Sequence, residues 1–474
     1  MGRPPKDRAA NAQLDYWLRR AGFSNRELAR AVTGRAAQEG ERHVHPDESR
    51  VRRWRARGET PRAPVPRLIA DLLSERVGTR LSIADIGMTP AHQAPPTGPD
   101  LPWHAQSTIT ALAYLTRSEL MRPHTRTSAD AMHIDHGDAL LGPIQRWTTA
   151  RPTPLGERTA AAEGRLGAAD VAELREITEA FRNLDNRHGG VLSRQAVIAQ
   201  VQHAVGLLNT CAYTESTGRA LFSAIADLGS VAGWMSFDAG EHRCAQRLFI
   251  TALHAASEGG DAATGAHILQ CMARQMSHLQ HYDDALDLVG LAQYGARRSL
   301  SPAAASMLAG LEARFHAILG NLPSADHAAR TAEDLFDRVT PEEEPAHTAF
   351  FDRAELSATL GVAHQIAAKH AETGTATSRH ADESLRLLTT ALDSRPEHRQ
   401  RSKAFDHLGM ARTHLVVAEV DGARAETITA LDLFSRLGSP RVGDRLIELH
   451  ADAAAYATDP TAADLRERIV HALA

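Results

Sequence analysis

Residues 233–253, GWMSFDAGEHRCAQRLFITAL, decide the fold of most of this chain. Small residues occupy Gly233, Ala245 and Ala252, and Gly240 separates two stretches of helical character. Glycine ends helices readily, and small residues on facing helices let the two backbones approach closely. The stretch therefore predicts a pair of packed helices joined by a turn at Gly240.

The same spacing recurs along the chain with a period of 40 residues. Alanines lie 40 residues apart in two series, Ala245, Ala285, Ala325 and Ala252, Ala292, Ala332, and Ala391 and Ala430 indicate later copies after an insertion around 340–380. Residues 233–253 resemble the tetratricopeptide pattern, although that repeat is usually about 34 residues long. The likeness, carried by Gly233, Ala245, Phe249 and Ala252, implies an α-solenoid of stacked helix pairs whose inner groove binds peptides or partner chains.

A second informative stretch, SRVRRWRARGETPR at residues 49–62, contains six arginines. On a helix, Val51 and Trp54 share one side and the arginines cover the rest. Gly58 and Pro61 end the helix. A basic face behind an apolar stripe suits binding to the DNA phosphate backbone beside a groove. The alternative is a solvated basic surface helix.

Other short helices are expected around this one. Leu14, Trp17, Leu18 and Ala21 predict a first helix, and a second is capped by Ser24 with Glu27 and ends near Thr33-Gly34, followed by a long turn over 34–46. Apolar stripes over 68–77 and 81–86 predict a fourth helix and a shorter fifth element. Residues 10–88, through Asn25–Ala29 and Val51–Trp54, resemble the phage-repressor type of helix-turn-helix, which implies DNA binding.

Candidate DNA-contacting residues follow from this interpretation. Arg50, Arg52 and Arg53 are expected at the major groove, Arg35, Arg55 and Arg57 nearer phosphates, and Ser49 at either. Gly2-Arg3-Pro4-Pro5-Lys6 contains a Gly-Arg-Pro core that could place Arg3 and Lys6 in a minor groove. The alternative for these five residues is a solvated chain start.

Charge divides the chain in the same way. Residues 1–80 hold 18 Lys and Arg against 10 Asp and Glu, whereas the remainder holds 35 against 48. A basic head on an acidic body suits a protein whose head alone binds a polyanion. We see no run of 18 apolar residues and no apolar signal core at the start, and the three cysteines are widely spaced, so we expect a cytoplasmic, nucleoid-associated protein without membrane contact.

The predicted architecture is all-α, with a helix-turn-helix domain followed by a tetratricopeptide-like α-solenoid. The expected parts are the DNA-binding domain at 1–88, a Pro-rich linker at 89–104, a helical connecting region at 105–215 and helical repeats at 216–474. The chain resembles actinobacterial regulators of this layout, some linked to sporulation and antibiotic production. Phe181–Gly190, Ala232–Gly240 and Ala245–Arg247 carry the likeness, which implies transcriptional regulation.

A row of residues across three repeats is the candidate effector site. Trp234, Arg274 and Arg314 follow the equivalent positions 233, 273 and 313, and stacked repeats would align them. Two guanidinium groups beside an indole could hold a peptide or small anionic effector. In the alternative, these arginines pair with internal acids such as Asp238 or Glu312.

No signature of catalysis or of a metal site stands out. The histidine groups around His133, His136, His278 and His281 lack further ligands at a recognised spacing, and no phosphate loop or nucleophile elbow occurs. We therefore expect no cofactor, no metal and no enzyme. We expect a homodimer on double-stranded DNA, because two half-sites sharpen discrimination. The alternatives are a repeat scaffold that docks on DNA non-specifically and an enzyme regulator without a nucleic-acid role.

Overall fold

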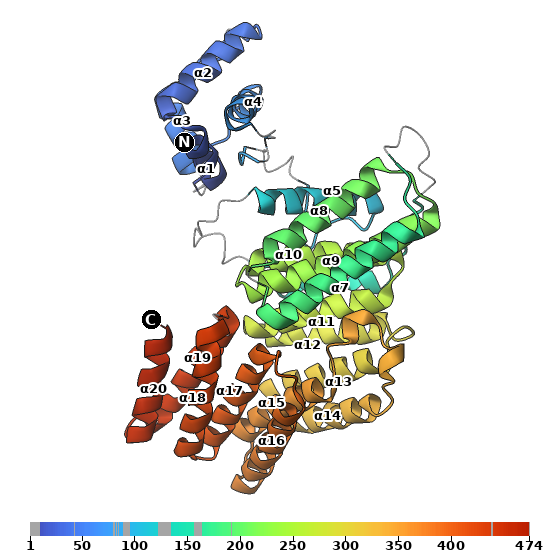
Figure 1. The fold of residues 1–474 in the computed structure, drawn as a ribbon, viewed down its shortest axis with the longest axis vertical. Helices are drawn as coiled ribbons and strands as arrows, with labels where there is room; N and C mark the ends of the chain where they lie inside the picture. Colours follow the sequence, from blue (N-terminus) through green and yellow to red (C-terminus); the bar gives the residue numbers. More distant parts are fainter. Residues whose placement is uncertain are drawn as a thin grey trace. The chain divides into compact units, whose positions relative to one another are not determined.

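The computed structural model describes residues 10–41, 43–78, 81, 83, 85–88, 95–121, 134–155, 164–190, 192–437 and 439–473. Within these ranges the regular elements are 20 α-helices and four short 3-10 helices, with one isolated bridge between Arg165 and Ala212 (Figure 1). The all-α prediction is confirmed. The chain forms two compact units, one of residues 1–96 with 110–133 and one of residues 97–109 with 134–474. The first unit thus includes residues beyond the predicted 1–88 domain.

Four helices build the N-terminal unit: α1 (Ala12–Ala21), α2 (Asn25–Gln38), α3 (Glu48–Arg57) and α4 (Val65–Val77). Their apolar stripes meet in one core that includes Leu14, Trp17, Val51 and Trp54. Ser24 caps α2 as predicted, because its side chain accepts from the Glu27 N–H and the Glu27 carboxylate accepts from the Ser24 N–H. The basic helix α3 therefore packs on a small buried core through Val51 and Trp54, beside a regularly capped α2.

Two predicted boundaries in this unit are wrong. Helix α2 continues through Gly34 to Gln38, because Ala36 extends the buried stripe by one turn beyond Val32. Described residues of 81–88 form turns rather than a fifth helix. Backbone carbonyls of these turns accept hydrogen bonds from side chains at the start of the chain instead of from a helix. The Asn11 amide donates to the Ile86 carbonyl, and the Trp17 indole donates to the Asp85 carbonyl, both at 3.0 Å. Because α2 extends to Gln38, the turn that follows it is shorter than the predicted turn over 34–46.

Helix α5 (Ala105–Leu120) contributes to both units, and the remaining helices belong to the second. These are α6 (Asp138–Ile144), α7 (Ala168–His188), α8 (Arg194–Thr210), α9 (Glu215–Asp238), α10 (His242–Gly259), α11 (Ala262–His278), α12 (Tyr282–Gly295), α13 (Pro302–Ile318), α14 (Leu322–Phe336), α15 (Arg353–His370), α16 (Gly374–Ser394), α17 (Gln400–Val416), α18 (Val420–Leu437), α19 (Pro440–Asp452) and α20 (Pro460–Leu473). The 3-10 helices are η1 (Gln145–Thr148), η2 (Pro341–Glu343), η3 (Ala346–Thr348) and η4 (Ala453–Tyr456).

From α9 onward the helices form consecutive packed pairs, α9 with α10 through α19 with α20 (Figure 1). Each odd-numbered helix also packs against the next odd-numbered one. The alanines spaced by 40 residues, and their later counterparts, are buried on the even-numbered helices: Ala245, Ala252, Ala285, Ala292, Ala325, Ala332, Ala391 and Ala430. A Cβ on Gly233 would lie 2.6 Å from the Phe249 ring, so this glycine permits the close approach of α9 and α10.

Among the described residues, one helix, α9 of the second unit, is long and apolar enough to cross a membrane by length and composition alone, although polar residues interrupt its apolar stretch. In its most apolar window, 78% of the residues are buried inside the structure. This is typical of a core helix, since α9 packs between α7, α8, α10 and α11. The apolar character of α9 therefore serves packing between helices.

Candidate functional sites: an arginine-covered helix and an arginine-lined pocket

Helix α3 is fixed at both of its ends and along its buried face. The Asp47 carboxylate caps its start by accepting from the Arg50 N–H at 2.8 Å, and Gly58 ends it in the left-handed conformation. Hydrogen bonds from the Ser49 hydroxyl and the Arg50 N–H lower the pKa of Asp47. Val51 and Trp54 are buried, so the opposite face of α3 lies in solvent.

Three arginines on that exposed face are available to a ligand. The side chains of Arg50, Arg52 and Arg57 are exposed, and within the described residues none forms an ion pair. Ser49, which was expected to contact DNA, donates to the Asp47 carboxylate at 2.7 Å. The face therefore presents three unneutralised guanidinium groups along one helix.

Three other predicted DNA contacts are engaged inside the unit. Arg55 binds Asp15 and donates to the Asn25 amide oxygen at 2.7 Å, so it fastens α3 to α1 and α2. Arg35 pairs with Glu75 at 2.6 Å, and Arg53 lies 3.3 Å from Glu59. Arg55, which was expected near phosphates, thus already has a carboxylate partner from a helix 40 residues earlier in the chain. Arg3 and Lys6 lie outside the described residues.

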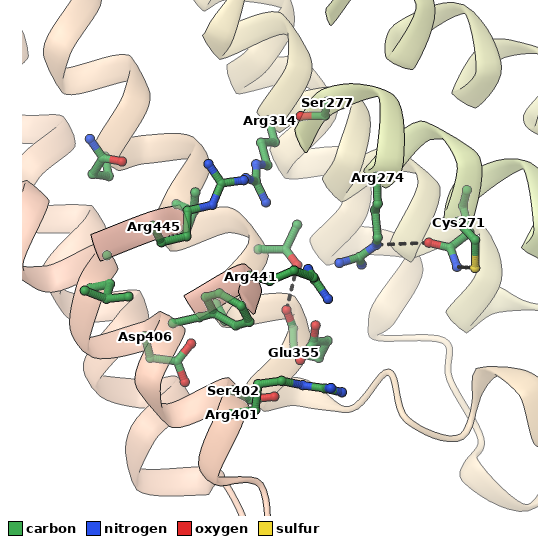
Figure 2. Close-up of a pocket in the computed structure, with 18 of the residues that line it drawn as sticks. Cys271, Arg274, Ser277, Arg314, Glu355, Arg401, Ser402, Asp406, Arg441 and Arg445 are labelled. Carbon is green, nitrogen blue, oxygen red and sulfur yellow. Dashed lines mark hydrogen bonds between the residues drawn. The ribbon is translucent and has the colours of Figure 1, made fainter. Parts of the chain in front are cut away.

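In the second unit, the odd-numbered helices α7 to α19 line a cavity of about 650 Å³. Figure 2 shows Arg274, Arg314, Arg441 and Arg445 extending into the same space from α11, α13 and α19. Cavities of this size suit small-molecule ligands. The predicted effector residues Trp234, Arg274 and Arg314 all line this pocket.

Arg274 and Arg314 have no acidic partner among the described residues. The Nε of Arg274 donates to the Gln270 amide oxygen at 3.0 Å, but its buried Nη2 has no partner. The buried Nε of Arg314 also has none. Burial, followed by the nearby charges of Arg445 and Arg274, lowers the pKa of Arg314 to about 9, so it remains a cation at neutral pH.

Asp238 and Glu312, the acids suggested as partners of Arg274 and Arg314, bind other residues. Asp238 pairs with Arg401 and, at 3.2 Å, with Arg441. Glu312 accepts from the Gln293 amide at 2.8 Å. Hence neither acid neutralises Arg274 or Arg314, and the alternative that named them is wrong.

The indole of Trp234 has a different neighbour from the one expected. The guanidinium of Arg441 lies over the Trp234 ring at 5.0 Å from its centroid, and over Phe237 and Phe405 as well. Arg441 is half-buried, and its loss of solvation lowers its pKa to about 10. Trp234 and Arg441 thus line the pocket together and form a cation–π contact.

Several pocket residues could not be found from the 40-residue repeat. Arg182 and Asp185 come from α7, in the region expected to be only connecting, and Arg182 pairs with Asp227 at 2.5 Å. Arg401 of α17 bridges Asp185 and Asp238, which lie in two of the segments that carry the regulator likeness. Contacts this distant in sequence leave no local pattern, so only the folded chain reveals them.

Among the residues that the structure describes, two groups of side chains could hold a metal ion. His136, His281 and Asp284 lie together, with the imidazoles stacked at 4.4 Å. His364, His380 and Asp326 form the other group. Each has a competing use: Asp284 accepts from the Gly137 N–H at 2.7 Å, and the Nδ1 atoms of His364 and His380 are 2.9 Å apart, a hydrogen bond. His133 lies outside the described residues.

The histidine pair also shows how its protons are arranged. Arg379 can only donate, so the Nε2 of His380 accepts from it at 3.0 Å. The proton of neutral His380 is therefore on Nδ1, from which it is donated to His364. A metal bound to both Nδ1 atoms would require the His380 proton to move to the atom that faces Arg379. This arrangement favours a hydrogen-bonded pair.

Comparison with known protein families gives a match in the N-terminal part of the chain. Residues 14–89 match the family model of the SP15 N-terminal domain. No curated protein matches the chain. The match covers most of α1, all of α2 to α4 and the turns after α4, the part that carries the arginine-covered helix.

Proposed function

We propose that this protein is a sequence-specific, DNA-binding transcriptional regulator, with repression the preferred direction. The observation that carries the proposal is the exposed face of α3, where Arg50, Arg52 and Arg57 have no acidic partner among the described residues while Val51 and Trp54 fix the helix on a core. Guanidinium groups on a rigid helix suit bidentate contacts to guanine and to phosphates. The helix-turn-helix interpretation of α1 to α4 belongs to this proposal.

We further propose that α9 to α20 form a tetratricopeptide-like solenoid with sensing and dimerising roles. Consecutive helix pairs with buried alanines at matching positions support it. The arginine-lined pocket would receive the effector. In this account the protein acts in the cytoplasm on double-stranded DNA as a homodimer, and no catalytic step is assigned to it.

The experiment is selection of duplexes from a randomised pool by the full chain at physiological salt. The proposal predicts an enriched sequence, and Arg52→Ala should lose that enrichment. Arg330→Ala is the charge-matched control, because Arg330 is exposed on α14 outside the N-terminal unit. Binding without any enriched sequence, weakened equally on all duplexes by salt, would instead support a scaffold docked on DNA non-specifically.

A further inference from the structure

We propose that the pocket lined by α7 to α19 binds a small phosphorylated molecule, whose phosphate groups are held by Arg274, Arg314 and Arg399. This inference deepens the proposed function by naming the chemical class of the effector, and it rests on that function only for the regulatory meaning of binding. Ligand binding itself can be measured without DNA.

The first argument is the charge of the lining. Nine arginines and one lysine line the pocket, against five carboxylates. All five carboxylates have cationic partners: Asp185 has Arg401, Glu355 and Asp406 have Arg395, Glu448 has Arg412 and Arg445, and Asp452 has Arg412 and Lys369. The pocket therefore carries an excess of positive charge that its own acids do not neutralise.

The second argument is where the excess lies. Arg274, Arg314 and Arg399 are the lining arginines without an ion pair among the described residues. Each also has a buried guanidinium nitrogen that finds no hydrogen-bond partner in the part of the chain that the structure describes. A buried cation without a partner is costly to the fold, and a bound anion would offset that cost. The lack of an ion pair and of a full set of hydrogen bonds at all three arginines, among the described residues, thus points to an anionic ligand.

The three arginines also act on neighbouring charges. Arg445 and Arg274 both oppose protonation of Arg314. Burial acts to raise the pKa of Glu355, but Arg395 and then Arg274, with a contribution from Arg399, lower it. Arg274 therefore lies near both Arg314 and the carboxylate close to Arg399, which links the three cations around one space.

Phosphate fits this set better than carboxylate. A carboxylate carries one charge and matches one guanidinium in a bidentate contact, whereas a phosphate ester carries about 1.5 to 2 charges and three acceptor oxygens. Three unpaired guanidiniums from separate segments, Arg274 in α11, Arg314 in α13 and Arg399 in the turn before α17, match the larger acceptor group. Apolar side chains of Ile318, Phe350 and Ile366 also line the pocket and would cover an uncharged part of the ligand.

The test is calorimetric titration of the full chain with inorganic pyrophosphate, and with citrate as a carboxylate of comparable charge. Saturable binding of pyrophosphate is expected, with a dissociation constant raised at least about tenfold in Arg274→Gln and Arg314→Gln. Arg330→Gln, which removes the same charge from the exposed surface of α14, should bind like the wild type. Absence of saturable pyrophosphate binding, or equal binding by all three variants, would overturn the proposal. Binding of citrate but not pyrophosphate would overturn the phosphate assignment.

Thermal unfolding without ligand provides a second, independent readout. Arg314→Met removes an unpaired buried cation, so the helical unit should melt higher by about 2 °C or more, while the shift caused by pyrophosphate is lost. If Arg314 were merely structural, the same change would lower the melting temperature and leave the pyrophosphate shift intact. These readouts do not involve α3, so their failure would leave the DNA-binding proposal standing.

Discussion

The Nε of Arg55 in α3 donates a hydrogen bond of 2.9 Å to the Asp15 carboxylate in α1. A second nitrogen of the same guanidinium reaches the Asn25 amide in α2 at 2.7 Å. One arginine of the basic stretch therefore ties three helices together, while Arg50, Arg52 and Arg57 of the same stretch face solvent. The arginines of α3 divide into a structural group and an exposed group, and the two groups should respond differently to substitution.

Arg55→Ala should destabilise the N-terminal unit by about 1–2 kcal/mol, because half-buried Asp15 loses a charge-assisted partner. Hydrogen exchange of the backbone amides of α1 to α4 in the full chain measures the loss. Arg57→Ala is the matched control and should change stability by less than about 0.5 kcal/mol. Equal stability of both variants would contradict the structural role of Arg55.

Arg52→Ala and Arg57→Ala should weaken binding to the selected duplex by about tenfold to a hundredfold while leaving the fold intact. Each exposed guanidinium that contacts a phosphate also releases counterions, so each loss should reduce the slope of log affinity against log salt by about 1. Fluorescence anisotropy across a salt series measures both quantities. Unchanged affinity in both variants would remove α3 from the interface.

The stability gain expected for Arg314→Met should depend on pH. In the folded protein the pKa of Arg314 is lowered to about 9, below its ordinary value of 12.5. The folded state thus binds this proton less tightly than the unfolded chain, and the cost of the charge is complete below pH 9 and declines above it. The variant should be more stable than the wild type by about 1–3 kcal/mol at pH 7, and less so at pH 10.5. Urea unfolding at both pH values tests this; a gain that grew with pH would contradict it.

Gly233→Ala should destabilise the helical unit by about 1–3 kcal/mol, because the added methyl group meets the Phe249 ring at 2.6 Å. Gly290 in α12 is the control: an added Cβ there has no neighbour within 4 Å, so Gly290→Ala should stabilise by about 0.5–1 kcal/mol. Thermal unfolding distinguishes the two signs. A neutral Gly233→Ala would show that α9 and α10 can separate without cost.

Local patterns in the sequence were enough to predict several elements. Capping by Ser24, the side shared by Val51 and Trp54, and the end of α3 at Gly58 each depend on residues close in the chain. The regular 40-residue period was also enough to align Trp234, Arg274 and Arg314, which line one pocket in the structure. Neighbouring repeats share one geometry, so a sequence offset becomes a position in space.

Long-range partners were beyond such patterns. Asp15 with Arg55, and Asp238 with Arg441, lie 40 and 203 residues apart. The insertion after α14 also interrupts the period, so the contributions of α15, α17 and α19 to the pocket carried no alignable signal. The length of α2 was missed because Gly34 resembles a helix end, although the buried Ala36 continues the stripe beyond it.

Genome-wide mapping of DNA bound by the native protein in living cells tests the central claim most directly, with a strain carrying Arg52→Ala and Arg57→Ala as the comparison. The account predicts discrete sites that share one sequence and are lost in the variant strain, while the protein level is unchanged. Bound DNA without a shared sequence, or sites retained in the variant, would contradict sequence-specific regulation through α3.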